Sequence, residues 1–233
     1  MLTWANTLWR GVYNRLRMWA IDGTWERVFT TLMAQADAED DLSWAVSVDS
    51  TIVRAHQHAA GARKKGPSRR AGRPRHRTVP RRTDHEDPPR RRHLLPPLAF
   101  VLTAGQAGDA PAFIDGMARL RVPRRRGRPR TRPEVVLADK AHSSRAIREH
   151  LRKRGIRAVI PVPADQRGHR LRRGSRVGRP PAFDRDAYKQ RSTVERCINR
   201  LKQWRGIATR YEKTATIYLA GLHIAGIFLW SAH

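Results

Sequence analysis

Residues 134–161 read EVVLADKAHSSRAIREHLRKRGIRAVIP. A first apolar run ends in a carboxylate at Asp139, and a second run, 156–161, follows a segment with Ser144 at its start and Gly155 at its end. Serine is a preferred N-cap and glycine a common terminator, so this segment is expected to be a helix. A helix between two strands forms a crossover, which predicts two parallel strands in one sheet.

Outside this unit the chain continues as predicted strands and helices. Two more apolar runs, 44–49 and 98–103, are typical of buried strands. Helical spacing or capping residues predict helices at 2–20, 25–36, 109–120, 187–204 and 214–230. Thr24 is expected to cap the second of these helices. The pattern predicts an α/β protein with a mixed sheet flanked by helices.

The composition limits the classes of function. The chain has 233 residues, with 48 Lys+Arg against 20 Asp+Glu and a formal net charge of +28. Such a charge makes a polyanion, above all nucleic acid, the expected partner. Most of the basic residues are arginine, which suits phosphate binding but is equally what GC-rich coding DNA produces. The lone cysteine, Cys197, excludes an intrachain disulfide, and a reducing cytoplasm is the expected setting.

No membrane association is expected. Residues 1–25 mix Trp, Arg and Asn and lack the apolar core of a signal peptide. The longest apolar stretch, 217–230, is shorter than the ~20 residues of a membrane span and contains a histidine.

Three stretches rich in Arg, Gly and Pro are expected to be irregular, namely 67–97, 123–133 and 165–181. The last two are compatible with loops that follow DNA phosphates and with plain solvent-exposed loops. The two N-terminal helices, with Arg15 and Arg17 on the first, fit part of a helix-turn-helix and a simple helical hairpin equally well.

Two aspartates end predicted core strands. Asp49 stands in Val-Asp-Ser-Thr and Asp139 in Leu-Ala-Asp-Lys-Ala. Ligands gather at strand ends in α/β sheets, and phosphate chemistry with two metal ions needs several carboxylates. An aspartate at a strand end taken alone is more often a turn or cap residue, so the case depends on a third carboxylate.

The predicted helix 187–204 supplies that carboxylate. Tyr188, Arg191, Glu195 and Lys202 follow one another at steps of 3, 4 and 7 residues, which place them on one helical face. Glutamate can bind a metal ion, arginine and lysine can hold phosphates, and tyrosine can stack on a base. The same spacing fits a solvent-exposed face with ion pairs.

These residues resemble a known family. Asp49, Asp139 and the Tyr-x2-Arg-x3-Glu-x6-Lys helix look like the DDE transposases of bacterial insertion sequences, in the group defined by that signature. The flanking words agree: VDSTIVRAHQHAAGA, LTAGQAGDA, LADKA and YKQRSTVERCINRLKQWRG. The resemblance runs from Val12 to the C-terminus with one gap.

The resemblance implies a ribonuclease-H-like fold with a short N-terminal helical segment. Residues 1–40 would be a residual helical DNA-binding segment and 41–233 the catalytic domain. Asp49, Asp139 and Glu195 would be the catalytic residues and the ligands of two Mg²⁺ or Mn²⁺ ions.

The implied reaction is DNA cleavage at the terminal inverted repeats of the element, followed by strand transfer into target DNA. Tyr188, Arg191, Lys202, Arg15 and Arg17 would contact DNA or its phosphates. Double-stranded DNA would be the partner of a homo-oligomer that holds two DNA ends. The expected place is the bacterial cytoplasm, in association with the nucleoid.

The chain departs from the family pattern in three places. Its helical region before Asp49 is shorter than usual, which predicts a truncated copy. His142 stands where a tyrosine is usual. His56 and His58 follow the first strand, and a phosphate-binding or structural role is expected for them rather than metal binding.

The third departure is the gap, where the family places a strand like GGLTTKIHL. One set of codons for Arg81–Pro89, read one base later, encodes that strand, so we hypothesise that about 67–96 are translated out of frame. The nucleotide sequence tests this hypothesis.

A stretch rich in Pro and Arg is a poor central strand, so 67–96 is predicted to be irregular and Asp49 to lie on a poorly paired edge. Impaired transposition would follow.

Two alternatives remain at this point. One is a nuclease on the same fold, which the Tyr-Arg-Glu-Lys spacing disfavours. The other is a non-catalytic basic remnant that binds DNA.

Overall fold

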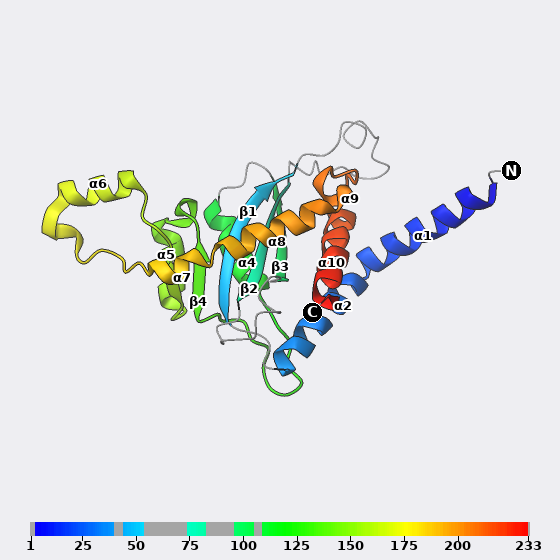
Figure 1. Ribbon diagram of the computed structural model, residues 1–233, viewed down its shortest axis with the longest axis horizontal. Coiled ribbons are helices and arrows are strands. Elements are labelled where there is room, and N and C mark those ends of the chain that lie inside the picture. Colours follow the sequence, from blue (N-terminus) through cyan, green and yellow to red (C-terminus); the bar gives the residue numbers. More distant parts are fainter. Residues whose placement is uncertain (1–2, 40–43, 54–73, 83–95, 105–108, 233) are drawn as a thin grey trace.

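A five-stranded mixed sheet with helices on both faces forms the centre of the computed structural model (Figure 1), which describes residues 3–39, 44–53, 74–82, 96–104 and 109–232. The strands are β1 (Ala45–Ile52), β2 (Pro74–Arg82), β3 (Pro97–Ala104), β4 (Val135–Ala138) and β5 (Arg157–Val159). The helices are α1 (Thr3–Ile21), α2 (Thr24–Ala38), α4 (Asp109–Arg119), α5 (Arg145–Lys153), α6 (Ala164–Arg173), α7 (Arg185–Lys189), α8 (Ser192–Gln203), α9 (Arg205–Ala208) and α10 (Ala215–Ser231). Two 3₁₀ turns, η1 (Lys140–His142) and η2 (Gly174–Val177), follow β4 and α6.

The strand order is β3-β2-β1-β4-β5. The pairs β1–β2 and β2–β3 are antiparallel, whereas β1–β4 and β4–β5 are parallel. The parallel pair predicted around the crossover helix is therefore confirmed. So is the mixed sheet, with its second strand between the first and the third, as expected of a ribonuclease-H-like fold.

The prediction that 67–96 is irregular is wrong for 74–82, because β2 pairs with β1 on one side and β3 on the other. Backbone N–H and C=O groups make the ladder whatever the side chains are, and the two prolines occupy permissive places. Pro74 is the first residue of the strand, and the register shifts between Val79 and Pro80. Asp49 consequently lies on a strand paired on both sides and not on an edge. The rest of 67–96, apart from its last residue, lies outside the described residues.

The two faces of the sheet are covered by different helices. Val46, Val48 and Val136 belong to the main core together with Phe113 of α4 and Ile147 of α5. Side chains alternate along a strand, so the neighbouring positions face the other way. On that second face Ala45, Val135, Leu137 and Val159 pack with Ala187 of α7, and α8 crosses β1 and β2 (Figure 1).

The N-terminal helices join this core only in part. Phe29 and Met33 of α2 are buried in the main cluster, next to α10. The N-terminal half of α1 extends away from the sheet (Figure 1), and Trp9, Val12 and Met18 of this helix are more than half exposed. Among the described residues no helix is long and apolar enough to cross a membrane.

Three local predictions need correction. Gly23, with φ of 76°, occupies the N-cap of α2 in place of Thr24, and the carboxylate of Asp22 accepts the Thr24 N–H at 2.8 Å. The stretch 165–181 contains most of α6 and the turn η2, and α6 has no buried residue and hence no periodic apolar pattern. The predicted helix 187–204 is two helices, α7 and α8.

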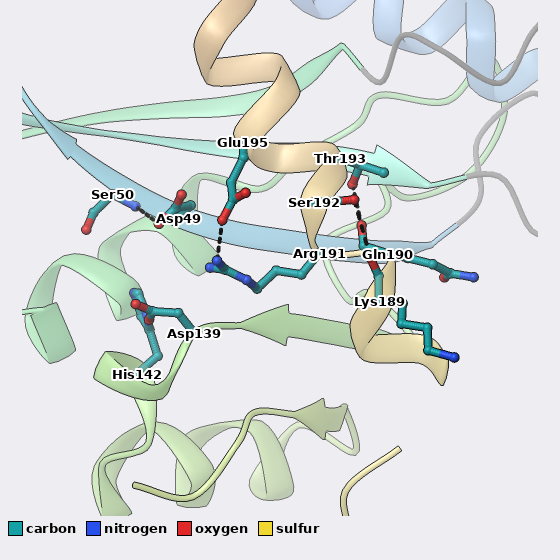
Figure 2. Close-up of polar contacts among 10 residues, drawn as sticks. All are labelled: Asp49, Ser50, Asp139, His142, Lys189, Gln190, Arg191, Ser192, Thr193 and Glu195. Carbon is teal, nitrogen blue, oxygen red and sulfur yellow. Dashed lines mark hydrogen bonds and ion pairs between the residues drawn. The ribbon is translucent and has the colours of Figure 1, made fainter. Parts of the chain in front are cut away.

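The break between α7 and α8 has a local cause. The Thr193 hydroxyl donates to the carbonyl of Gln190 at 2.8 Å, and the Ser192 hydroxyl donates to that of Lys189 at 3.3 Å (Figure 2). Hydroxyl groups that bond nearby carbonyls compete with the helical ladder. The backbone between the two helices uses tighter bonds, such as Arg191 N–H to the Tyr188 carbonyl at 2.9 Å.

Candidate active site

Asp49 and Asp139 lie side by side because of the register of the two central strands. Val48 of β1 is the Cα partner of Ala138 of β4 in a parallel pair, so the next residue along each strand is an aspartate. Both aspartates follow residues of the main core and therefore point to the opposite face, the one covered by α7 and α8. The two predicted strand-end carboxylates thus share one face of the sheet.

Glu195 comes to the same place from the first turn of α8. In Figure 2 its side chain points towards the aspartates, with Arg191 between them. The guanidinium of Arg191 forms an ion pair and hydrogen bond with Glu195, and its centre lies 5.9 Å from the ring centroid of Tyr188. Three of the four residues of the predicted helical face are therefore neighbours in space even though the helix is broken.

The electrostatics of the aspartates confirm that these charges are close together. Burial raises the pKa of Asp49, and the nearby carboxylates Asp139 and Glu195 raise it further. The Ser50 N–H, which donates to Asp49 at 2.8 Å, and the positive charge of Arg191 oppose that rise in pKa. The site thus gathers three carboxylates around one guanidinium.

Asp139 is hydrogen-bonded to His142, which stood out in the sequence only as a departure from the family pattern. His142 is almost fully buried at the end of η1, and its Nδ1 is hydrogen-bonded to the Asp139 carboxylate (Figure 2). An ionised carboxylate only accepts, so Nδ1 carries the proton. This hydrogen bond is the main cause of the lowered pKa of Asp139. The ring of Phe113, 5.8 Å away, packs against the imidazole.

The remaining predicted contacts with DNA are distributed more widely. Lys202 is exposed on α8, seven positions after Glu195. Arg15 and Arg17 are exposed on α1, where the Arg15 guanidinium lies over the Trp19 ring at 5.5 Å. Arg15 and Arg17 thus lie on a different element from the carboxylates. His56 and His58 lie outside the described residues.

The donors fit a hard divalent cation, because all three are carboxylates on a half-buried face. As placed, however, no three His, Cys, Asp or Glu side chains of the described residues are close enough to hold one ion. The Arg191 guanidinium lies among these carboxylates, where it forms an ion pair with Glu195 and its positive charge favours the ionised form of both aspartates.

A ribonuclease-H-like sheet with two strand-borne aspartates and a helical glutamate is the arrangement that the resemblance to DDE transposases implies. A family model described as Transposase DDE domain matches residues 41–230. The chain belongs to this family.

Two relatives come from bacterial insertion sequences. A protein described as a transposase for insertion sequence element IS402 of Burkholderia cepacia is 34% identical over 165 residues, which are 67% of this chain and 69% of that protein. Another, for insertion sequence element IS6501 of Brucella ovis, is 40% identical over 50 residues, covering 22% of this chain and 38% of that protein. The chain is thus a bacterial insertion-sequence DDE transposase.

Among solved structures, the catalytic domain of the Mos1 mariner transposase is similar at 11% identity and a TM-score of 0.30, covering 89% of each chain. That TM-score is low, and the fold assignment rests on the strand order and register of this chain.

Proposed function

We propose that this chain catalyses metal-dependent cleavage and strand transfer of DNA at the terminal inverted repeats of its insertion sequence. The observation that carries the proposal is the meeting of Asp49, Asp139 and Glu195 on one face of the sheet. Their number and chemistry suit two divalent ions, Mg²⁺ or Mn²⁺.

Each residue of the site has a distinct part in this proposal. Asp49, Asp139 and Glu195 would hold the metal ions, which when bound would supply an activated nucleophile and stabilise charge on the phosphoryl and leaving oxygens. Asp49 and Asp139 provide fixed ligands from neighbouring strands, whereas Glu195 becomes available when Arg191 releases it. Arg191 then turns to a DNA phosphate, which its planar fork can hold with two hydrogen bonds.

The contacts with DNA extend beyond the carboxylates. Tyr188 and Lys202 flank Glu195 and would position the cleaved end, while Arg15 and Arg17 would bind the duplex from α1. A second copy would hold the other DNA end. The reaction would take place on the bacterial nucleoid.

The expectation of an impaired copy loses its structural premise, because β2 is paired on both sides. Impairment remains a prediction from the composition of 74–82. It is tested by comparing this chain with a frame-restored version in the same assay, where equal rates would contradict it.

A joining assay tests the function. The chain is incubated with duplexes that carry the repeats flanking its gene, a target plasmid, and Mn²⁺ or Mg²⁺. Cleavage that leaves a 3′-hydroxyl, followed by joining to the plasmid, is expected. Cleavage without joining would favour the nuclease alternative, and binding without either reaction would favour the DNA-binding remnant.

A further inference from the structure

A groove of about 900 Å³ opens between α5 and the segment formed by α6 and η2. Six arginines line it, namely Arg145, Arg148, Arg152, Arg170, Arg173 and Arg176. The acidic residue in its wall, Glu149, forms an ion pair with Lys153 at 3.3 Å. The groove is therefore strongly positive.

Most of this positive charge has no counter-charge. Within the described parts of the chain, no carboxylate forms an ion pair with Arg145, Arg152, Arg173 or Arg176. Packing does not explain the arginines of α6 either, because this helix has no buried residue and lies at the far end of the molecule from α1 (Figure 1). A surface of this kind is suited to an external polyanion.

One wall of the groove is nevertheless fixed. The Arg148 guanidinium donates to the Ser143 hydroxyl at 2.9 Å and to the Ile160 carbonyl at 2.8 Å. The Ser143 hydroxyl in turn donates to the Gln166 side chain at 3.1 Å, which ties the first turn of α6 to the end of η1. These bonds give the groove a defined shape in the absence of a ligand.

One wall of the groove lies next to the turn that holds Asp139. Ser143 in its wall directly follows His142, which is hydrogen-bonded to Asp139. An extended strand of nucleic acid in the groove would thus pass close to the carboxylates.

We propose that this groove binds the phosphodiester backbone of the DNA next to the cleavage site. Arginine matches phosphate with bidentate hydrogen bonds, and a row of arginines matches a row of phosphates. This inference rests on the proposed function for the identity of the polyanion, and it assigns the α6–η2 segment as a DNA-binding element.

The salt dependence of DNA binding tests the groove. Affinity for a fluorescent duplex is measured by anisotropy, without metal, from low to moderate salt, for the wild type and for Arg173→Gln combined with Arg176→Gln. The magnitude of the negative slope of log affinity against log salt is expected to fall by about 0.9 for each phosphate that is no longer neutralised, about 1.8 in all. Arg152→Gln, on the α5 wall, should lower it by about 0.9.

The control removes the same charge elsewhere. Arg119→Gln combined with Arg121→Gln, in a pocket beside α2, should leave the slope unchanged within error. Equal slopes for the two double variants would overturn the proposal. If the wild type cleaves DNA but the groove variants behave like the control, only the groove is refuted. If no cleavage occurs but the slope falls, the groove stands and the proposed function fails.

Discussion

Arg191 forms an ion pair with Glu195 one helical turn further along, and the positive charge of the same guanidinium opposes the rise that burial causes in the pKa of Asp49 and adds to the lowering of the pKa of Asp139 by His142. One cation of the chain thus partly neutralises three carboxylates from three elements. Arg191 supplies positive charge to this site, and a bound metal ion would take over that role.

Arg191→Leu should therefore destabilise the protein most when metal is absent. Loss of a partly buried charge pair of this kind should lower the free energy of unfolding by about 1–2 kcal/mol and the Tm by about 2–8 °C. Mn²⁺ should raise the Tm of the variant more than that of the wild type, as thermal unfolding with and without Mn²⁺ would show. Arg196→Leu, an exposed neighbour on α8, is the control; equal effects of both substitutions would contradict the counter-charge role.

His142 is expected to act as a positioning residue for Asp139. In His142→Asn the amide N–H can replace Nδ1–H, so the affinity for Mn²⁺ should stay close to the wild-type value. In His142→Leu the hydrogen bond is lost, and the affinity should fall about 10–100-fold. Calorimetric titration with Mn²⁺ measures both, with circular dichroism to confirm folding. Similar affinities for the two variants would argue against positioning.

Two glycines of α10 provide a matched pair for the core. A Cβ on Gly226 would lie 2.6 Å from the Phe29 ring and 3.2 Å from the Phe100 ring, whereas a Cβ on Gly221 meets nothing within 4 Å. Gly226→Ala should lower the free energy of unfolding by about 1–3 kcal/mol. Gly221→Ala should leave it unchanged or raise it by up to about 1 kcal/mol. Urea denaturation compares them, and an equally stable Gly226→Ala would show that α10 packs differently.

Buried His223 makes stability depend on pH. It packs between Phe29 and Phe100, and burial, with a smaller effect of Arg119, lowers its pKa to about 4. The unfolded chain binds the proton more tightly, so stability is complete above about pH 6.5 and falls towards pH 4, by about 3 kcal/mol.

The test is urea denaturation at several pH values between 4 and 7. His223→Phe should flatten this pH dependence, since it removes the group whose pKa differs between the folded and the unfolded chain. His169→Gln, an exposed histidine on α6, should retain it. A wild-type slope that survives in His223→Phe would show that another group is responsible.

The sequence predicted those parts of the fold that apolar runs define. The strands that became β1, β3, β4 and β5 carry such runs, and Ser144 and Gly155 delimit α5 as expected, with the Ser144 hydroxyl accepting from Ile147 N–H at 3.2 Å. The segment that forms β2 has no apolar run in the sequence and α6 has no buried residue, so no sequence pattern predicted either element.

The site was predictable to a similar extent. The strand ends pointed to the two aspartates and the helical spacing to Glu195, and the family resemblance then implied that the three act together as catalytic residues. The role of His142 was not, because its contact with Asp139 depends on the three-residue turn η1 and on burial against Phe113.

The most direct test of the account is metal-dependent cleavage of a repeat-bearing duplex by four variants. Asp49→Asn, Asp139→Asn and Glu195→Gln should each reduce the rate of cleavage on the order of a thousandfold, while the duplex still binds. Glu134→Gln, exposed just before β4, should cleave at the wild-type rate. Wild-type cleavage by any one of the first three variants would contradict the claim that these carboxylates form a single active site.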